Sequence, residues 1–470
     1  MTVAGSERRI VVATADTVAA RMAGPAIRAW QIAAALGREH EVRLVTTGRC
    51  DVTAPAAFSV AAVGDRGLRE AEQWCDVLVY QGPAMAGAQE LHRSERVHVI
   101  DLYDPFHLEQ LEQSRDLYPE ERRRRTREGV DMVDAQLRRG DFFLCASEKQ
   151  RDFWLGHLAA LGRVNTVTYD DDATLRSLIT VVPFGIPEQP AVQTRRAVRG
   201  VIAGIGPDDD LLLWGGGVYN WFDPLTLLHA VDRLRRRRPQ VRLLFMGLRH
   251  PNPGVPEMRM AREARALAAQ LGLTGTHAFF NEEWVAYDDR QNFLLESDLG
   301  VSTHLDHVET AYSYRTRVLD YVWAGLPVVS TAGDSLSELV ERRGLGLTVP
   351  PGDVDALDDA LFRLLDDKAL AAECRERARD VAQELAWERV LEPLVEFCRT
   401  PRRAPDLLDA ATIASITGSS DGDTPARERA SDTGWRRDVR LAVAHLRHGG
   451  PRQLVARAMG RIRRTRWARR

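Results

Sequence analysis

The stretch ETAYSYRTRVLDYVWAGLPVV, residues 309–329, combines two carboxylates with two arginines at short spacing. Glu309 follows a predicted strand, Arg315 and Arg317 precede or open a predicted helix, and Asp320 lies near the start of that helix. The first turn of a helix offers free backbone N–H groups and the positive end of the helix dipole, which favour a phosphate. Arginine can add two parallel hydrogen bonds to a phosphate, and a carboxylate can accept from ribose hydroxyls. The stretch therefore predicts a nucleotide site.

Strand-sized apolar runs alternate with helix-length segments in two successive series, which is typical of parallel sheets covered on both faces. We therefore predict an α/β protein of two facing Rossmann-like, doubly wound domains, at 1–186 and 187–400, with ligands bound where the strands of both sheets end. A last helix at 387–398 is expected to pack back toward the first domain. The expected strands are Arg9–Ala15, His40–Thr46, Val77–Tyr80, Val97–Asp101, Phe142–Ala146, Ile179–Val182, Leu211–Trp214, Val241–Met246, His277–Phe280, Leu299–Ser302 and Pro327–Ser330.

Residues 8–398 resemble the retaining glycosyltransferases of family 4. The resemblance is carried by MAGPAIRAWQIAAAL with HEVRLVT, by VVPFGIP, by LLLWGGGVYNWFDPLTLLHAV with VRLLFMG, by HAFFNEEWVAYDDRQNFLLESDLGVST, and by AGLPVVST. It implies the GT-B fold, a nucleotide-diphosphate sugar as donor, transfer with retention, and no metal or other cofactor. It also implies an acceptor site in the first domain and a donor site in the second.

In the family, two glutamates separated by seven residues bind the donor. Alignment on AGLP places Asp320 at the second glutamate, where the resemblance implies binding of the ribose. The first position falls on Tyr312, so we expect Glu309, three residues earlier, to act at the sugar hydroxyls or the reacting centre.

The family also places an arginine and a lysine in the first strand–helix loop of the second domain. Here that loop contains Gly215, Gly216 and Gly217 and no cation. Backbone N–H groups of such a loop can still approach a phosphate. We expect the positive charge to come from one or more of four residues: Arg315, Arg317, Arg249 and His250. Trp284 is expected to lie near the nucleotide base.

Two loops of the first domain are expected to face the same cleft. Gly24 and Pro25 open a predicted helix where family members pass close to the diphosphate and the acceptor. The strand Val97–Asp101 continues into DLYDPFH. From this segment we expect Asp101 and Tyr103 to bind the acceptor and Asp104 and His107 to handle protons; the resemblance also allows the departing phosphate to take the acceptor's proton.

Two kinds of acidic motif invite a metal interpretation that we do not adopt. His304, Asp306 and His307 alternate on a loop after a strand, and Asp triplets occur at 170–172 and 208–210. Both patterns are more typical of solvated loops, so we expect no metal site. Five cysteines without CxxC spacing indicate thiols in a reducing compartment, and we expect a cytoplasmic protein.

The net charge of −3 conceals an uneven distribution. Residues 435–470 contain 12 arginines and one aspartate, a local +11, so residues 1–434 carry −14. We predict a disordered linker at 401–434 and a basic amphipathic tail at 435–470 that binds the inner, anionic face of a membrane. Nucleic acid bound without specificity, or no partner, are the alternatives for the tail.

The sequence thus predicts a glycosyltransferase that moves a sugar from a nucleotide-diphosphate donor to a saccharide or lipid-linked acceptor of a cell-surface glycan. Two alternatives stay open. A GT-B sugar-nucleotide epimerase would interconvert the free donor without an acceptor. A non-catalytic nucleotide-sugar-binding protein would keep the fold, and the missing cation pair and the altered glutamate spacing are its support.

Overall fold

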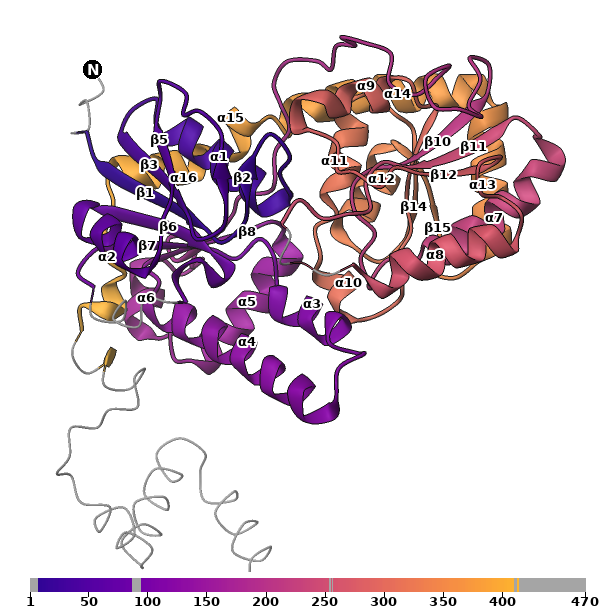
Figure 1. Ribbon diagram of the computed structural model, residues 1–470. Coiled ribbons are helices and arrows are strands. Elements are labelled where there is room, and N and C mark those ends of the chain that lie inside the picture. Colours follow the sequence, from indigo (N-terminus) through magenta and orange to yellow (C-terminus); the bar gives the residue numbers. More distant parts are fainter. Residues whose placement is uncertain (1–6, 87–93, 253–254, 256, 410–411, 414–470) are drawn as a thin grey trace, which may run out of the picture. The chain divides into compact units, whose positions relative to one another are not determined.

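A computed structural model describes residues 7–86, 94–252, 255, 257–409 and 412–413. The residues up to Asp409 form one compact unit that contains two large sheets (Figure 1). The predicted tail and most of the predicted linker lie outside the described residues. No helix of the described part of the chain has both the length and the apolar character that crossing a bilayer requires.

The N-terminal sheet has seven parallel strands in the order β5-β3-β1-β6-β7-β8-β9. Helices α1, α15 and α16 cover one face, and α2, α4 and α5 cover the other. The strands are β1 (Arg9–Thr14), β3 (Glu41–Thr46), β5 (Ser59–Ala62), β6 (Val77–Gln81), β7 (Val97–Asp101), β8 (Phe142–Cys145) and β9 (Ile179–Val181); β2 (Val18–Ala19) and β4 (Cys50–Asp51) form a separate pair. The helices are α1 (Gly24–Leu36), α2 (Asp65–Trp74), α3 (Phe106–Gln113), α4 (Pro119–Arg139), α5 (Glu148–Ala160) and α6 (Thr166–Asp171).

The C-terminal sheet has six parallel strands in the order β12-β11-β10-β13-β14-β15, again doubly wound. They are β10 (Asp210–Trp214), β11 (Val241–Phe245), β12 (Ala278–Phe280), β13 (Leu299–Ser302), β14 (Val328–Thr331) and β15 (Gly346–Val349). The helices are α7 (Pro224–Arg237), α8 (Arg259–Gln270), α9 (Arg290–Leu295), α10 (Val308–Tyr312), α11 (Thr316–Trp323), α12 (Ser335–Arg343), α13 (Val354–Asp366), α14 (Lys368–Glu384), α15 (Trp387–Val390) and α16 (Glu392–Arg399).

Central strands of both sheets are buried on both faces, which explains why they read as continuous apolar runs. All five residues of β10 are buried, and so are all five of β6. Within the two large sheets, the strands that the sequence did not predict are β5 and β15, which lie at the sheet edges and are mostly exposed or half-buried. An edge strand with little buried surface lacks the apolar signal on which the prediction depended.

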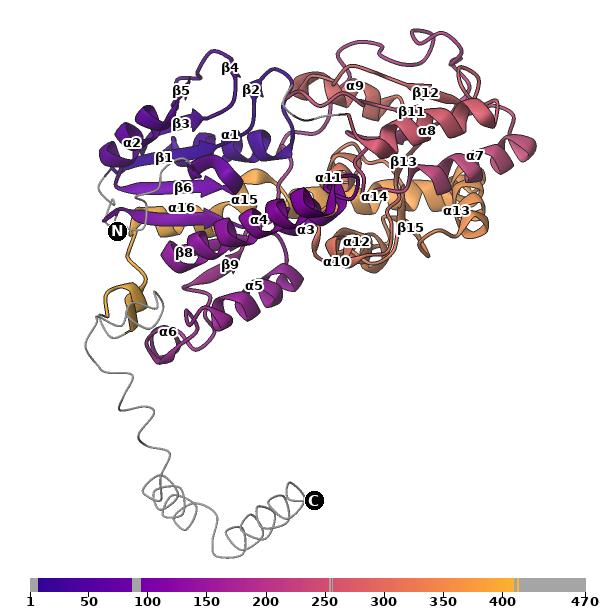
Figure 2. The same ribbon diagram turned by 60° about the horizontal axis from the view of Figure 1, so that its bottom comes forward.

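The C-terminal helices α15 and α16 lie against α1 of the N-terminal domain (Figure 2). Phe397 stacks on Phe142 with ring centroids 4.2 Å apart. Trp387 packs on Phe184 at 4.8 Å. One helix was expected at 387–398, whereas the chain turns at Leu391 and continues as a second short helix whose first turn contains a proline.

The expected linker does not begin at Pro401. Residues 401–409 run along the N-terminal domain, where Asp406 accepts two hydrogen bonds from Arg163, at 2.6 and 3.2 Å, with neither side chain exposed. Asp141 accepts from Arg403 at 2.9 Å and from the backbone N–H of Ala404 at 3.0 Å. Composition suggested a flexible segment, but these buried ion pairs fix it in place.

Candidate active site

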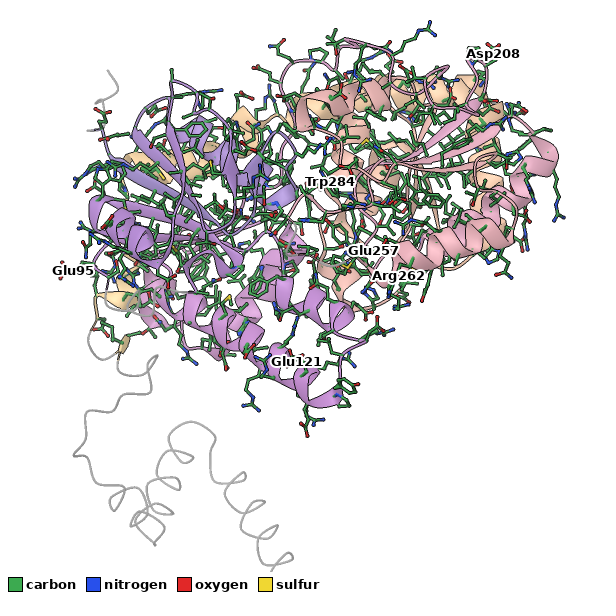
Figure 3. The ribbon with its side chains drawn as sticks, in the orientation of Figure 1. Glu95, Glu121, Asp208, Glu257, Arg262 and Trp284 are labelled. Carbon is green, nitrogen blue, oxygen red and sulfur yellow. The ribbon has the colours of Figure 1, made fainter. Side chains whose placement is uncertain are left out.

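The loops that follow the strands of both sheets converge on a cleft of about 300 Å³. The N-terminal domain contributes the segments after β1, β7 and β9, and the C-terminal domain contributes those after β10, β11, β12 and β13. Carboxyl ends of parallel strands are where doubly wound sheets bind ligands. The cleft therefore brings together residues far apart in the sequence, and Figure 3 shows Trp284 in the space between the two sheets.

The glycine loop after β10 lines the cleft with backbone alone. Gly216 has φ +82°, a left-handed conformation that glycine adopts without strain. A Cβ on Gly217 would lie 3.0 Å from the ring of Tyr219 and 3.1 Å from that of Trp284. The loop therefore needs glycines both for its path and for the close approach of two rings.

Arg317, in the first turn of α11, lines the cleft beside this loop. It donates from Nη2 to the carbonyl of Gly217 at 2.8 Å, and its guanidinium lies 4.0 Å from the ring centroid of Phe222 and 4.5 Å from that of Trp214. Only 8% of the residue is exposed, and Nη1 is buried with no hydrogen-bond partner in the described structure. Burial lowers the pKa of Arg317 to about 10, so the group is charged at neutral pH. A buried cation without a carboxylate partner favours an anionic ligand.

Arg315 also lines the cleft, but Glu309 neutralises it. Its Nη1 and Nη2 donate to the two oxygens of Glu309 at 2.9 and 2.7 Å. Glu309 is 1% exposed and is not among the residues that line the cleft. The expected direct contact of Glu309 with the donor sugar does not agree with this geometry, because both carboxylate oxygens already hold Arg315.

Asp320 lies on α11 at the edge of the cleft, with 30% of its side chain exposed. Arg290 donates from Nε to its Oδ1 at 3.0 Å. The guanidinium of Arg290 lies 3.6 Å from the ring centroid of Tyr287 and 4.4 Å from that of Trp323. Asp320 is therefore held from one side and open to the cleft on the other, as a ribose ligand requires.

Trp284 and His250 bring the second domain against the first. The indole N–H of Trp284 donates to the carbonyl of Met22 at 3.1 Å. His250 lines the cleft near Asp16 of the loop after β1. Burial lowers the pKa of His250, and the negative charge of Asp16 partly opposes this shift. Gly24, at the start of α1, and Pro25 line the same wall of the cleft.

Asp104 and Glu109 form a hydrogen-bonded pair of carboxyl groups on the N-terminal wall. Burial, and then the charge of Glu309, raises the pKa of Asp104 to about 7. Burial and the neighbouring Asp104 raise the pKa of Glu109 well above its usual value. Two carboxyl groups in contact must share a proton. Tyr103, which also lines the cleft, is 7% exposed.

Besides Glu309, three predicted site residues do not line the cleft. Asp101 is 4% exposed and accepts from Arg28 at 2.6 and 2.9 Å, so it is a buried structural partner and not an acceptor ligand. His107 stacks on Phe153 at 5.8 Å, and burial lowers its pKa to about 4. Arg249 lies in solvent, where it pairs with Glu283 at 3.3 Å. These three residue types could take part in the predicted chemistry, but their side chains lie outside the cleft lining.

The sequence did not predict four residues that shape the cleft: Asp16, Glu109, Tyr287 and Arg290. Glu109 is two residues after His107 on the same predicted segment, and Asp16 directly follows the first predicted strand. Position at the end of a strand would have indicated Asp16. No local signal links Arg290 with Asp320.

Comparison with known proteins agrees with the observed fold. Residues 208–367 match the family model described as Glycosyl transferases group 1. WaaG, a glycosyltransferase involved in lipopolysaccharide biosynthesis, superposes with a TM-score of 0.59 at 17% identity over 84% of this chain and 100% of its own. HepE from Anabaena, solved in complex with UDP-glucose, gives 0.57 at 15% identity over 83% and 99%. The matched domain is thus similar to group 1 glycosyltransferases, and the fold of the whole described unit is the GT-B fold of these structures.

Among curated proteins, an exopolysaccharide phosphotransferase of Streptomyces coelicolor is 31% identical over 226 residues, 43% of this chain and 22% of its own length. This chain spans less than a quarter of the length of the curated relatives that it matches. The similarity therefore describes a shared domain.

Proposed function

We propose that the protein transfers a sugar from a nucleotide-diphosphate donor to a saccharide or lipid-linked acceptor with retention of anomeric configuration. The observation that carries the proposal is Arg317, a buried, unpaired guanidinium in the cleft beside a glycine loop. HepE, whose fold is similar, was solved with UDP-glucose, which supports a donor of this kind.

The diphosphate, the ribose and the base of the donor each have a matching group. The diphosphate faces Arg317, the backbone of Gly215 and Gly216, and the start of α11. Asp320 accepts from the ribose, and Trp284 lies by the base. When the sugar–phosphate bond breaks, negative charge develops on the departing diphosphate, and a preorganised cation at that place lowers the barrier.

On the other side of the cleft, the acceptor hydroxyl attacks from the N-terminal wall. Its proton passes either to the departing phosphate or to the Asp104–Glu109 pair, which lines the cleft and whose pKa values are raised. Glu309 holds Arg315 in place and acts through it. No resident metal or cofactor is part of the proposal.

The test begins with titration calorimetry of UDP, ADP, GDP and dTDP against the full chain and against Asp320→Ala. One nucleotide should bind, and Asp320→Ala should weaken it by about tenfold or more, equivalent to roughly 1.4 kcal/mol. The corresponding nucleotide sugars are then followed by proton NMR of the anomeric signals. A retained product with an acceptor, or slow donor hydrolysis, supports transfer. An epimerised free donor supports the epimerase, and absence of all nucleotide binding rejects the proposal.

We further propose that residues 435–470, with their local charge of +11, bring the enzyme to an anionic membrane surface. Deletion of 435–470 should release the protein from vesicles that contain anionic lipid and leave binding to neutral vesicles unchanged. The deletion should not extend to 401, because residues 401–409 pack on the N-terminal domain. Equal sedimentation of both forms with anionic vesicles would reject a role for the tail.

A further inference from the structure

The two walls of the cleft differ in the type of ionisable residue that they carry. The charged residues that line it from the described part of the N-terminal domain are all acidic: Asp16, Asp104 and Glu109. The C-terminal domain contributes three arginines, one aspartate and a histidine: Arg290, Arg315, Arg317, Asp320 and His250. A ligand that fills the cleft therefore meets acid on one side and predominantly cations on the other.

The carboxyl groups around the cleft fall into two sets. Three are paired with arginine: Asp101 with Arg28, Glu309 with Arg315, and Asp320 with Arg290. The acidic wall, defined as Asp16, Asp104 and Glu109, forms no ion pair with arginine or lysine within the described residues. The charge of Arg315 reaches Asp104 and Glu109, but its Nη1 and Nη2 are committed to Glu309.

The acidic wall keeps acceptor capacity for a ligand. Asp16 accepts from the backbone N–H of Thr17 at 2.9 Å and from the side chain of Asn252, and Asp104 and Glu109 bond to each other. A carboxylate has about four lone-pair positions, so these contacts leave several of them open. Hydroxyl or ammonium groups of a sugar would fill them.

Arg317 is a second, independent indication that the cleft binds a charged ligand, with the anionic part of that ligand against the C-terminal wall. It is more than nine-tenths buried, and its Nη1 lies in the lining without a partner. Because the anion of the donor takes this cation on the C-terminal wall, the opposite wall is left for the acceptor. The acceptor therefore meets carboxyl groups and no unpaired cation.

We propose that the acceptor's reacting end is a sugar rich in hydrogen-bond donors and free of anionic groups, neutral or amino, and that the acidic wall discriminates against phosphorylated and uronic sugars. The inference rests on the proposed function, because it assigns the acceptor class of the same cleft. An anionic acceptor would meet Asp16 and the Asp104–Glu109 pair, which keeps one carboxylate when its two groups share a proton, and like charges at this partly buried wall repel. Neutral and amino sugars instead supply donors to the open lone pairs.

The test uses glucose, galactose and mannose, each as the free sugar, the 2-amino sugar and the 6-phosphate, with glucuronate added. Saturation-transfer NMR measures their binding to the full chain in the presence of saturating nucleoside diphosphate. At least one ring series should bind as the neutral or amino form about tenfold or more tightly than as the 6-phosphate. In Asp104→Asn/Glu109→Gln that ratio should fall toward one. Glu121→Gln, on the outer side of α4, is the matched control and should keep the ratio (Figure 3).

The outcomes separate the two proposals. Nucleotide binding together with tighter binding of a 6-phosphate or of glucuronate overturns the inference alone, as does a ratio that the double variant leaves unchanged. Absence of binding by every probe while the nucleotide binds also overturns it. Loss of nucleotide binding in the unaltered chain overturns the proposed function and this inference with it. A circular dichroism spectrum and melting temperature close to those of the unaltered chain establish that the variants are folded.

Discussion

Arg290 holds Asp320 from a helix that begins 30 residues earlier, with Nε 3.0 Å from Oδ1. Its guanidinium lies over two rings, those of Tyr287 and Trp323, so its position is fixed on three sides. The contact orients one carboxylate oxygen inward and leaves the other side of Asp320 facing the cleft. The carboxylate that we propose binds the ribose is on α11, whereas the residue that orients it, Arg290, is on α9.

Replacing Arg290 by lysine should weaken nucleoside diphosphate binding by about three- to tenfold, because lysine keeps the charge but loses the flat stacking surface. Titration calorimetry measures the change. In a double-mutant cycle with Asp320→Ala the two effects should be less than additive, since both act on one contact. Arg195→Lys is the control, as Arg195 is a half-exposed arginine that pairs with the half-buried Asp289. Fully additive effects would contradict the assignment.

Replacing Arg317 by methionine should have opposite effects on binding and on stability. Nucleoside diphosphate affinity should fall by about 10- to 100-fold, the cost of losing hydrogen bonds to a charged group. The melting temperature without nucleotide should stay equal or rise, because a buried unpaired cation is removed. Arg249→Met, at an exposed position, should change neither quantity. Unchanged affinity in Arg317→Met would show that another group binds the diphosphate.

The Asp104–Glu109 pair should make stability depend on pH. Asp104 has a folded pKa of about 7, above the usual 3.8, so folding favours its protonated form. Its effect is absent below about pH 4, grows more destabilising as pH rises toward 7, and is constant above. Asp104→Asn should therefore raise the melting temperature more at pH 8 than at pH 5. Thermal melts of both proteins at both pH values measure this, with Glu121→Gln as the control. An equal shift at the two pH values would argue against the raised pKa.

The ion pair between Arg163 and Asp406 should anchor the C-terminal segment to the N-terminal domain. Asp406→Asn leaves a buried guanidinium without its counter-charge, which costs about 3–5 kcal/mol of unfolding free energy. The double variant Arg163→Met/Asp406→Leu should recover most of that loss, because neither charge is then left alone. Urea unfolding followed by tryptophan fluorescence measures both. A single variant as stable as the unaltered chain would show that the contact contributes little.

The fold was predictable because doubly wound sheets leave a strong pattern. Buried parallel strands such as Leu211–Trp214 are apolar throughout, and the segments between them have helix length. The edge strand Ser59–Ala62 escaped prediction since three of its four residues are exposed. The segment 401–409 does not form a linker although its polar composition resembles one, because Asp406 is buried in an ion pair with Arg163 and Arg403 pairs with the buried Asp141.

Site residues could be predicted only where a short stretch of sequence contains the motif that identifies them. Gly216, Trp284, Arg317 and Asp320 lie in local motifs, and all four line the cleft. Which arginine pairs with which carboxylate could not be predicted, because the chain has 62 arginines and many of them could reach a given carboxylate from distant positions in the sequence. The Arg28–Asp101 pair joins residues 73 positions apart, and spacing gives no hint of it.

The bond from the indole of Trp284 to the carbonyl of Met22 makes this side chain a native optical probe. The ring lies by Gly217 of the glycine loop, while its N–H donates to a residue of the other domain. Indole emission shifts when that N–H exchanges a carbonyl for water, so separation of the two domains would change its wavelength. Subtracting the spectrum of Trp284→Phe isolates this signal from the other nine tryptophans among the ten in the chain. The emission wavelength of Trp284 should therefore report whether the two domains stay in contact at the cleft.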